Sequence, residues 1–177
     1  TIDKTITVRT FKLNSVILSC ADDRDIPPFT IDIEIVEEDT WQLMAADTAA
    51  AELDEHPIRL MTSLIDQQPV PAGEVIDKGN QWRPVIFNLD EDPPCRPEWV
   101  KSALDRVMDL IEERGINSLS MPLPAYQQHC LSSRSAIRLL LDSLKAVPAD
   151  KPLNIWLKTA RSALEQVTQE LGQQISP

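Results

Sequence analysis

The pattern of hydrophobic and polar residues is most regular in the second half of the chain. From Pro84 onward, short apolar segments alternate with longer segments in which apolar residues recur at helical spacing. Strands separated by single helices are joined by crossovers, so this order predicts a mainly parallel sheet with helices packed on it. The predicted strands span 84–89, 117–121 and 153–158, and the predicted helices span 97–114, 132–146 and 160–175.

The first half of the chain predicts strands that extend this sheet. Residues 6–12 partly alternate and 15–20 form a short apolar run, which favours a buried strand. Residues 29–36 alternate strictly between apolar and polar positions, and this is typical of a half-exposed strand near an edge of a sheet. The segment around Gly79-Asn80 predicts a turn between two paired strands.

An alanine-rich helical segment lies between these strands. It extends to about residue 67, with Asp47 as the expected N-cap and Pro57 as a point where the helix kinks or splits. In the later helix over 97–114, Pro97 suits the first turn and Gly115 suits the C-cap. The pattern as a whole favours the α/β class, as a single domain over residues 1–177.

Charge and apolar content exclude two classes of partner. The chain has 17 basic and 28 acidic residues and a net charge of −11, whereas nucleic-acid binders gain affinity by neutralising phosphates with basic residues. No apolar run approaches the roughly 20 residues of a membrane span. We therefore expect neither a nucleic-acid partner nor a membrane partner, and we interpret the acidic clusters as solvated loops.

The cysteines favour a reducing compartment. Cys20, Cys95 and Cys130 are an odd number at wide spacing, in a chain large enough to fold without disulfides. The first ten residues show no secretory pattern, and the sequence therefore predicts a cytoplasmic location. It lacks the closely spaced cysteine and histidine ligands of a zinc site, and we expect no metal and no cofactor.

Four segments follow one another in an order that is typical of a known family. They are PAGEVID at 71–77, WRPVIFNL at 82–89, EERGINSLSMPL at 112–123 and LNIWLK at 153–158. Through them, residues 69–159 resemble the second half of a macro domain. The resemblance implies a three-layer α/β/α fold with a mainly parallel mixed sheet. It also implies a function, because members of this family bind ADP-ribose and some hydrolyse its bonds to proteins or small molecules.

The family's two glycine-rich loops are missing at the positions that the resemblance gives them. A backbone that cradles a diphosphate must approach it closely and often adopts a positive φ, which glycine permits without a Cβ clash. The first loop position, 41–49, and the second, 122–133, contain none of the four glycines of the chain. We therefore expect the usual mode of ADP-ribose binding to be lost.

The resemblance and the pattern together suggest candidate ligand-binding residues. Ser19 and Asp22 lie where the family has asparagines, although an acid beside a diphosphate would repel it. Two aromatic residues, and free N–H groups at the start of the helix near 132, are further candidates at the mouth of the site. These further candidates are Trp41, Tyr126, Ser132, Ser133 and Arg134, whose alternative roles are packing and helix capping.

Two other groups of residues invite a chemical interpretation. His129 and Cys130 adjoin in a loop, but neighbouring side chains rarely face each other, so a surface histidine beside a half-buried thiol is the favoured interpretation over a nucleophilic pair. Residues 90–92 are consecutive acids, whose alternate side chains diverge, and this favours an acidic loop over a Mg²⁺ or Ca²⁺ site.

Three hypotheses for function follow from the sequence. The favoured one is a non-catalytic module that binds a nucleotide-related metabolite, such as an ADP-ribose-like ligand, or a protein. The second is an ADP-ribosyl hydrolase with rebuilt loops. The third is a structural subunit that docks on a partner through the helix at 160–175.

Overall fold

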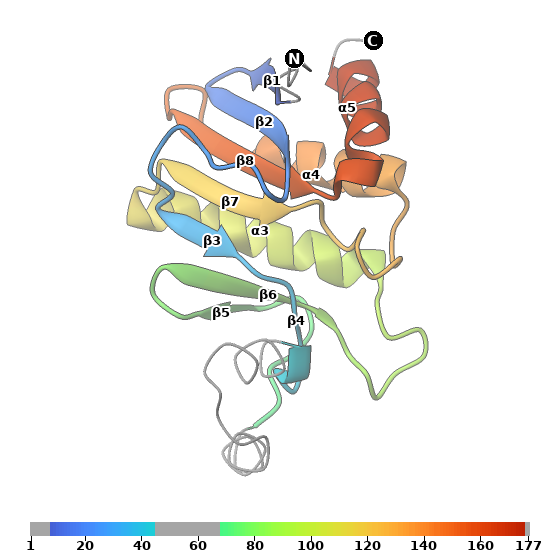
Figure 1. Ribbon diagram of the computed structural model, residues 1–177. Coiled ribbons are helices and arrows are strands. Elements are labelled where there is room, and N and C mark those ends of the chain that lie inside the picture. The colour runs from blue at the N-terminus through green and yellow to red at the C-terminus, as the bar shows by residue number, and fades with distance from the viewer. Residues whose placement is uncertain (1–7, 45–67, 176–177) are drawn as a thin grey trace.

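The computed structural model describes residues 8–44 and 68–175 (Figure 1). The predicted helix that ends near residue 67, with Asp47 and Pro57, lies outside the described residues. The strands are β1 (Arg9–Leu13), β2 (Val16–Asp22), β3 (Ile33–Ile35), β4 (Glu38–Asp39), β5 (Val75–Asp77), β6 (Gln81–Phe87), β7 (Ser118–Pro122) and β8 (Leu153–Thr159). The helices are α3 (Pro97–Arg114), α4 (Ser133–Leu144) and α5 (Arg161–Ile175).

The described strands form one sheet in the order β1-β2-β8-β7-β3-β6-β4, and β5 pairs with β6. All neighbouring pairs from β2 to β4 are parallel, whereas β1 and β5 pair in the antiparallel sense. This arrangement confirms the predicted α/β class and the mainly parallel mixed sheet. It also places the carboxyl ends of the parallel strands along one edge of the sheet, which is where open α/β sheets bind ligands.

Strand β3 corrects one prediction. It lies between β6 and β7 in the interior of the sheet, so the expectation of a strand near an edge was wrong. The alternation itself is present, because Ile33 and Ile35 are buried and Glu34 is exposed. An alternating pattern reports which face of a strand meets solvent, and it does not report which strands lie on either side.

The three described helices begin and end as their sequences predict. Pro97 opens α3, and Gly115 closes it in the left-handed conformation with φ 62°. Ser132 caps α4, since its side chain accepts a hydrogen bond from the N–H of Ser135 at 3.2 Å. Each helix buries an apolar stripe in the same core as the sheet, represented by Val107, Leu140 and Leu171. None of the helices in the described ranges is long and apolar enough to cross a membrane.

A disulfide joins two loops at the carboxyl edge of the sheet. Cys95 follows β6 and Cys130 follows β7, and the two are bonded across a sequence separation of 35. Cys20 is a buried free thiol in β2. The expectation of unpaired cysteines, with a half-buried thiol at Cys130, was therefore wrong. Spacing along the chain could not reveal the pair, because β6 and β7 follow each other in the sequence but are separated in the sheet by β3, so their loops meet only in the completed fold.

Candidate functional site

Two adjoining cavities open at the carboxyl edge of the sheet. The larger cavity has a volume of about 550 Å³ and the smaller cavity a volume of about 320 Å³. Gln127 and Lys158 line both of them, so the two form a continuous candidate site around the ends of β7 and β8. The polar side chains that line the larger cavity are Asp23, Glu34, Glu37, Gln127, Gln128 and Lys158.

The larger cavity is acidic. Its lining holds three carboxylates, Asp23, Glu34 and Glu37, against one ammonium group, Lys158. The Nζ atom of Lys158 lies 4.0 Å from Oε1 of Glu34, so its charge is already partly balanced. Since like charges repel most strongly where water is displaced, this lining is unfavourable for a diphosphate.

Glu37 is the most unusual of these carboxylates. Glu37 is buried, with 8% of its surface exposed. Its Oε2 accepts a hydrogen bond from the N–H of Ala125 at 2.7 Å. Oε1 is buried and has no partner among the described residues. Burial raises the pKa of Glu37 to about 7, and the hydrogen bond from Ala125 opposes this rise.

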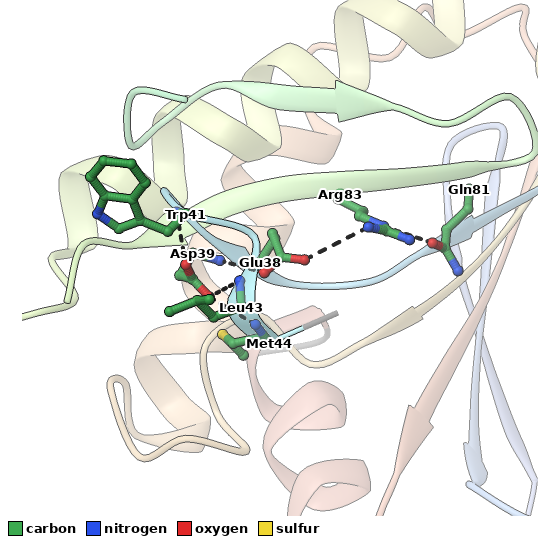
Figure 2. A network of polar contacts seen from close by, with 7 residues as sticks. All are labelled: Glu38, Asp39, Trp41, Leu43, Met44, Gln81 and Arg83. Atoms are coloured by element: carbon green, nitrogen blue, oxygen red, sulfur yellow. Dashed lines mark hydrogen bonds and ion pairs between the residues drawn. The ribbon is translucent and has the colours of Figure 1, made fainter. Parts of the chain in front are cut away.

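A second buried acid binds the backbone of the first loop position (Figure 2). Asp39 is fully buried; its Oδ1 accepts the N–H of Trp41 at 2.8 Å. Its Oδ2 accepts the N–H groups of Leu43 and Met44 at 3.0 and 2.9 Å, where a helical turn begins. These N–H groups are the kind that bind anions at helix starts. In this chain an internal carboxylate already occupies them.

Glu38, between these two acids, is also buried and supports the same turn. Its Oε1 accepts the N–H of Asp39 at 3.0 Å, and its Oε2 lies 3.9 Å from the Arg83 guanidinium. Arg83 in turn donates to Oε1 of Gln81 at 2.8 Å. A buried carboxylate is tolerated when it is paired and hydrogen-bonded, so this network keeps the chain rigid where it enters the first loop position.

Several amides of the second loop position are also bonded within the chain. The N–H of Ala125 binds Glu37, as described above. The N–H of His129 donates to the carbonyl of Tyr126 at 3.0 Å, and the N–H of Cys130 donates to the carbonyl of Ala125 at 3.1 Å. These amides are therefore not available to an incoming phosphate.

The loops reach the left-handed conformation without glycine. Gln42 has φ 61° in the first loop position, and Ala125 and His129 have φ 58° and 59° in the second. The inference that positive φ is lost along with the glycines was therefore wrong. A non-glycine residue in this region costs about 1 to 2 kcal/mol, and the hydrogen bonds made by Asp39 and Glu37 offset that cost locally.

The sequence suggested seven ligand-binding residues. One of them, Tyr126, lines the smaller cavity. Ser19 is buried within β2, and its Oγ lies 3.4 Å from Oγ1 of Thr10. Asp22 ends β2, and its Oδ1 accepts the N–H of Arg24 at 3.1 Å. The next residue, Asp23, is the one that lines the larger cavity.

The other four suggested residues lie outside both cavities. Trp41 donates its indole N–H to Oδ2 of Asp90 at 2.8 Å. Ser132 is the N-cap of α4, and Ser133 is buried with its Oγ 3.5 Å from Gln166 Nε2. Arg134 is exposed. These four do not line either cavity, so the structure does not bring the seven together.

The two other groups that the sequence singled out, His129 with Cys130 and the acids at 90–92, do not form a chemical site among the described residues. The disulfide consumes the thiol of Cys130, and His129 is an exposed residue that lines the smaller cavity. Asp90 holds the indole of Trp41. In the ranges 8–44 and 68–175, no three histidine, cysteine or acidic side chains gather in a way that could hold a metal ion.

The sequence contains a signal for one of the residues that were missed. In the alternation that begins at Phe29, Ile33 and Ile35 face the core, and Glu37 is the next position in that register. An acid in an apolar register must find a partner or change its pKa. Asp39 lies beyond a register shift, beside the equally buried Glu38, so the alternation does not reach it. Glu37 and Asp39 are both buried, and one binds the backbone of each loop position. Lys158 and Gln127 gave no such signal, because polar residues at the ends of strands are common.

Comparison with known proteins shows which solved structures have a similar fold. No protein-family model matches the sequence, and a search of curated proteins found no match. Among solved structures, the chain is similar to an Oceanobacillus iheyensis macrodomain with ADP, with a TM-score of 0.68 and 16% identity over 95% of this chain and 96% of that one. For the macrodomain of Thermus aquaticus DarG the TM-score is 0.59 and the identity 13%, over 81% and 99%.

A third similar structure is the Trypanosoma brucei macrodomain in complex with ADP-ribose, with a TM-score of 0.55 and 14% identity over 82% of this chain and 64% of that one. At such identities the likeness concerns the fold, and the order and pairing of the strands described above are part of it. The chain has the α/β fold of a macrodomain, in a divergent form.

Proposed function

We propose that this chain is a non-catalytic module that binds a nucleotide-related ligand in the larger cavity without holding a diphosphate on its loop amides. One observation carries the proposal: amides at the described part of both loop positions are already bonded within the chain. Asp39 takes the N–H groups at the first position, and Glu37 takes the N–H of Ala125 at the second.

The position of the cavity supports a small-molecule ligand. It lies at the carboxyl edge of a mainly parallel sheet, and a volume of about 550 Å³ is in the range of sites for drug-sized molecules. Proteins of similar fold have been solved with ADP and with ADP-ribose, which favours a nucleotide-related ligand over other metabolites.

Electrostatics support the loss of the diphosphate. Three carboxylates and one ammonium group line the larger cavity. Lys158 already lies near Glu34. A doubly charged linker would meet net repulsion there, and the N–H groups of Leu43 and Met44 would not be open to it, because Asp39 accepts them.

Chemical-shift mapping of the backbone amides tests the proposal, with ADP-ribose, adenosine and inorganic pyrophosphate added in parallel. We expect adenosine and ADP-ribose to shift amides around the larger cavity, at Gln127, Gln128 and Lys158, and pyrophosphate to leave the amides of Leu43 and Met44 unmoved. Shifts at Leu43 and Met44 with pyrophosphate would show that the loop does hold phosphate, and no shifts with any nucleoside would refute the binding module.

A second candidate function, an ADP-ribosyl hydrolase, is favoured by one observation. Glu37 has a pKa raised to about 7, and acids of that pKa in a cavity are suited to general acid–base catalysis. Incubation with an ADP-ribosylated protein separates the two candidates. Release of free ADP-ribose that is lost in Glu37→Gln would establish the hydrolase, whereas no release supports the non-catalytic module.

A protein partner remains part of the proposal, but docking through the apolar face of α5 is not favoured. Leu164, Val167 and Leu171 are buried in the chain's own core, so that face is already covered. A partner would have to contact the polar side of α5. Sedimentation of the protein alone and with nucleoside would reveal any association.

Two broader expectations also stay proposals. A single hydrophobic cluster joins the sheet to α3, α4 and α5, which supports one domain over 1–177, and limited proteolysis would test it. A cytoplasmic location was expected from unpaired cysteines, but the disulfide between Cys95 and Cys130 is the kind that persists in oxidising compartments. Trapping free thiols with an alkylating agent at cell lysis would decide between the two.

A further inference from the structure

The disulfide joins two surface loops at the edge of the sheet where the cavities open. Cys95 ends the loop after β6, and Cys130 lies in the second loop position, after β7. Both residues are half-buried, and each directly follows exposed residues, at 89–94 and at 127–129. The pair therefore lies where surface loops meet the core, and disulfides near the surface are the ones that exchange with thiols in solution.

The loop that carries Cys95 is fixed by contacts of its own. The N–H of Asn88 donates to the carbonyl of Pro94 at 2.7 Å, and Cys95 forms a β-bridge with Phe87, the last residue of β6. This loop therefore gives Cys130 an attachment point that does not depend on the second loop position.

The loop that carries Cys130 forms part of the wall of both cavities. Gln127 and Gln128 line the larger cavity, and Tyr126, Gln127 and His129 line the smaller one. The N–H of His129 donates to the carbonyl of Tyr126 at 3.0 Å. This bond closes a turn inside the loop, and it does not tie the loop to the rest of the fold.

The wall at 126–129 lies between two attachments. At one end the N–H of Ala125 binds Glu37, and at the other end Cys130 is bonded to Cys95. His129, directly beside Cys130, has φ 59°. This conformation is unfavourable for a residue with a Cβ atom and persists where the surroundings enforce it. The disulfide is the attachment on the His129 side of the wall.

We propose that Cys95 and Cys130 are a reversible thiol–disulfide site, whose oxidised form fixes the cavity wall at 126–129 and whose reduced form releases it. The reaction partner is a dithiol. One of its thiolates attacks one sulfur of the pair and forms a mixed disulfide, while the other cysteine leaves as a thiolate and takes up a proton. The second thiol of the partner then displaces the first cysteine, which is protonated in turn. Two electrons and two protons pass to the pair, and the dithiol becomes a disulfide.

Relaxation of the backbone amides, measured on the unmodified protein before and after treatment with dithiothreitol, tests the release. Order parameters at Gln127, Gln128 and His129 should be about 0.85 in the oxidised form, as in rigid backbone, and below about 0.6 in the reduced form. Asn88, in the other loop, and Ile155, in β8, should stay near about 0.85 in both forms. Reoxidation should restore the first set of values.

Three results would overturn the inference. Unchanged order parameters at 127–129 would show that the wall does not need the disulfide. An equal fall at Asn88 and Ile155 would show that the disulfide supports the whole fold and not this wall in particular. A folded protein that dithiothreitol does not reduce would show that the pair is closed to exchange.

Titration calorimetry with adenosine tests the consequence for the cavities, and this part of the inference rests on the proposed function. Reduction should weaken adenosine binding by about fivefold or more, because a wall that is in place for only a fraction of the time lowers the apparent affinity by that fraction. Equal affinities of the two forms would contradict the inference. If adenosine binds neither form, the proposed function fails, and the order parameters alone decide the inference.

Two variants assign the effect to this pair of cysteines. The double variant Cys95→Ser, Cys130→Ser should show the low order parameters and the weaker adenosine binding with or without dithiothreitol. Cys20→Ala removes the free thiol in β2 and keeps the disulfide, so it should respond to dithiothreitol as the unmodified protein does. A response that persists in the double variant would overturn the inference. The two redox forms of the unmodified protein decide it even if the double variant does not fold.

Discussion

The carboxylate of Glu37 accepts the backbone N–H of Ala125 at 2.7 Å, across a separation of 88 positions in the chain. This hydrogen bond ties the segment that leaves β3 to the loop that leaves β7, at the edge where the cavities lie. It is made by an acid that burial otherwise destabilises in its charged form. The site is therefore linked to the stability of the whole chain.

The first prediction concerns pH and stability. Burial raises the pKa of Glu37 from 4.5 to about 7, so the folded state binds this proton more tightly than the unfolded chain does. Its contribution to stability is fully present below about pH 4.5 and is lost as the pH rises through 7, by roughly 3 kcal/mol in all. Urea unfolding of the unmodified protein and of Glu37→Gln at several pH values measures it. The difference in the free energy of unfolding between the two proteins should shrink or invert between about pH 4.5 and pH 7. Parallel plots of this free energy against pH would contradict the raised pKa.

A second prediction concerns the backbone at Ala125. This residue is buried with φ 58°, where a glycine would avoid the strain of a Cβ atom. Ala125→Gly loses a buried methyl group and relieves that strain, so the free energy of unfolding should change by less than about 1 kcal/mol.

Ala136 provides the matched control, because it is equally buried but lies inside α4. Ala136→Gly loses a methyl group and also helix propensity, and it should destabilise the protein by about 2 kcal/mol. Denaturant titrations of both variants give the comparison. Equal losses would show that the left-handed turn at Ala125 carries no strain.

The third prediction concerns the internal anion at the first loop position. Asp39→Asn replaces one acceptor oxygen by an amino group, which cannot accept the N–H groups of Leu43 and Met44. Because Asp39 itself is fully buried, the variant should be less stable by about 2 to 3 kcal/mol in thermal unfolding.

Asp90 offers a control, since it also bonds to Trp41 but is exposed. Asp90→Asn should alter stability by no more than about 0.5 kcal/mol. A loss at Asp39 no larger than the loss at Asp90 would mean that the network in Figure 2 does not hold the turn.

The fourth prediction concerns the cysteines. Reduction of the Cys95–Cys130 disulfide, which closes a loop with a sequence separation of 35, should lower stability by about 3 to 4 kcal/mol. Burial raises the pKa of the Cys20 thiol to about 11, so this thiol should resist alkylation in the folded protein. Mass spectrometry after alkylation should find no label before reduction, labels on Cys95 and Cys130 after it, and a label on Cys20 upon unfolding. Labelling of Cys130 without a reductant would contradict the disulfide.

The sequence predicted the elements of the fold well where local rules decide them. Pro97, Gly115 and Ser132 set the ends of helices through their own backbone preferences, and each acts as expected. The position of β3 in the sheet was not predictable, because strand neighbours depend on pairing across long separations. The disulfide between Cys95 and Cys130 was not predicted either, because it also depends on contacts between distant parts of the chain.

The candidate site was less predictable than the fold. Ser19 and Asp22 were suggested by resemblance, and the structure places them in β2 rather than in a cavity wall. Glu37 lies in the core register that Ile33 and Ile35 set, and this was the available signal. Asp39 lies beyond a register shift, so the alternation gave no signal for it. What no pattern could supply was their partners, since the hydrogen bond from Ala125 to Glu37 depends on the completed fold.

The carboxylate of Asp39 has a consequence for how the first loop position can be engineered. Because it is attached to the same short turn, it faces the amides of Leu43 and Met44 at a local concentration in the millimolar range or above, which a free phosphate in solution seldom matches. The carboxylate therefore competes with any phosphate for these amides. Glycines introduced at the first loop position would therefore not open the amides of Leu43 and Met44 to a phosphate unless this tethered acid were also removed.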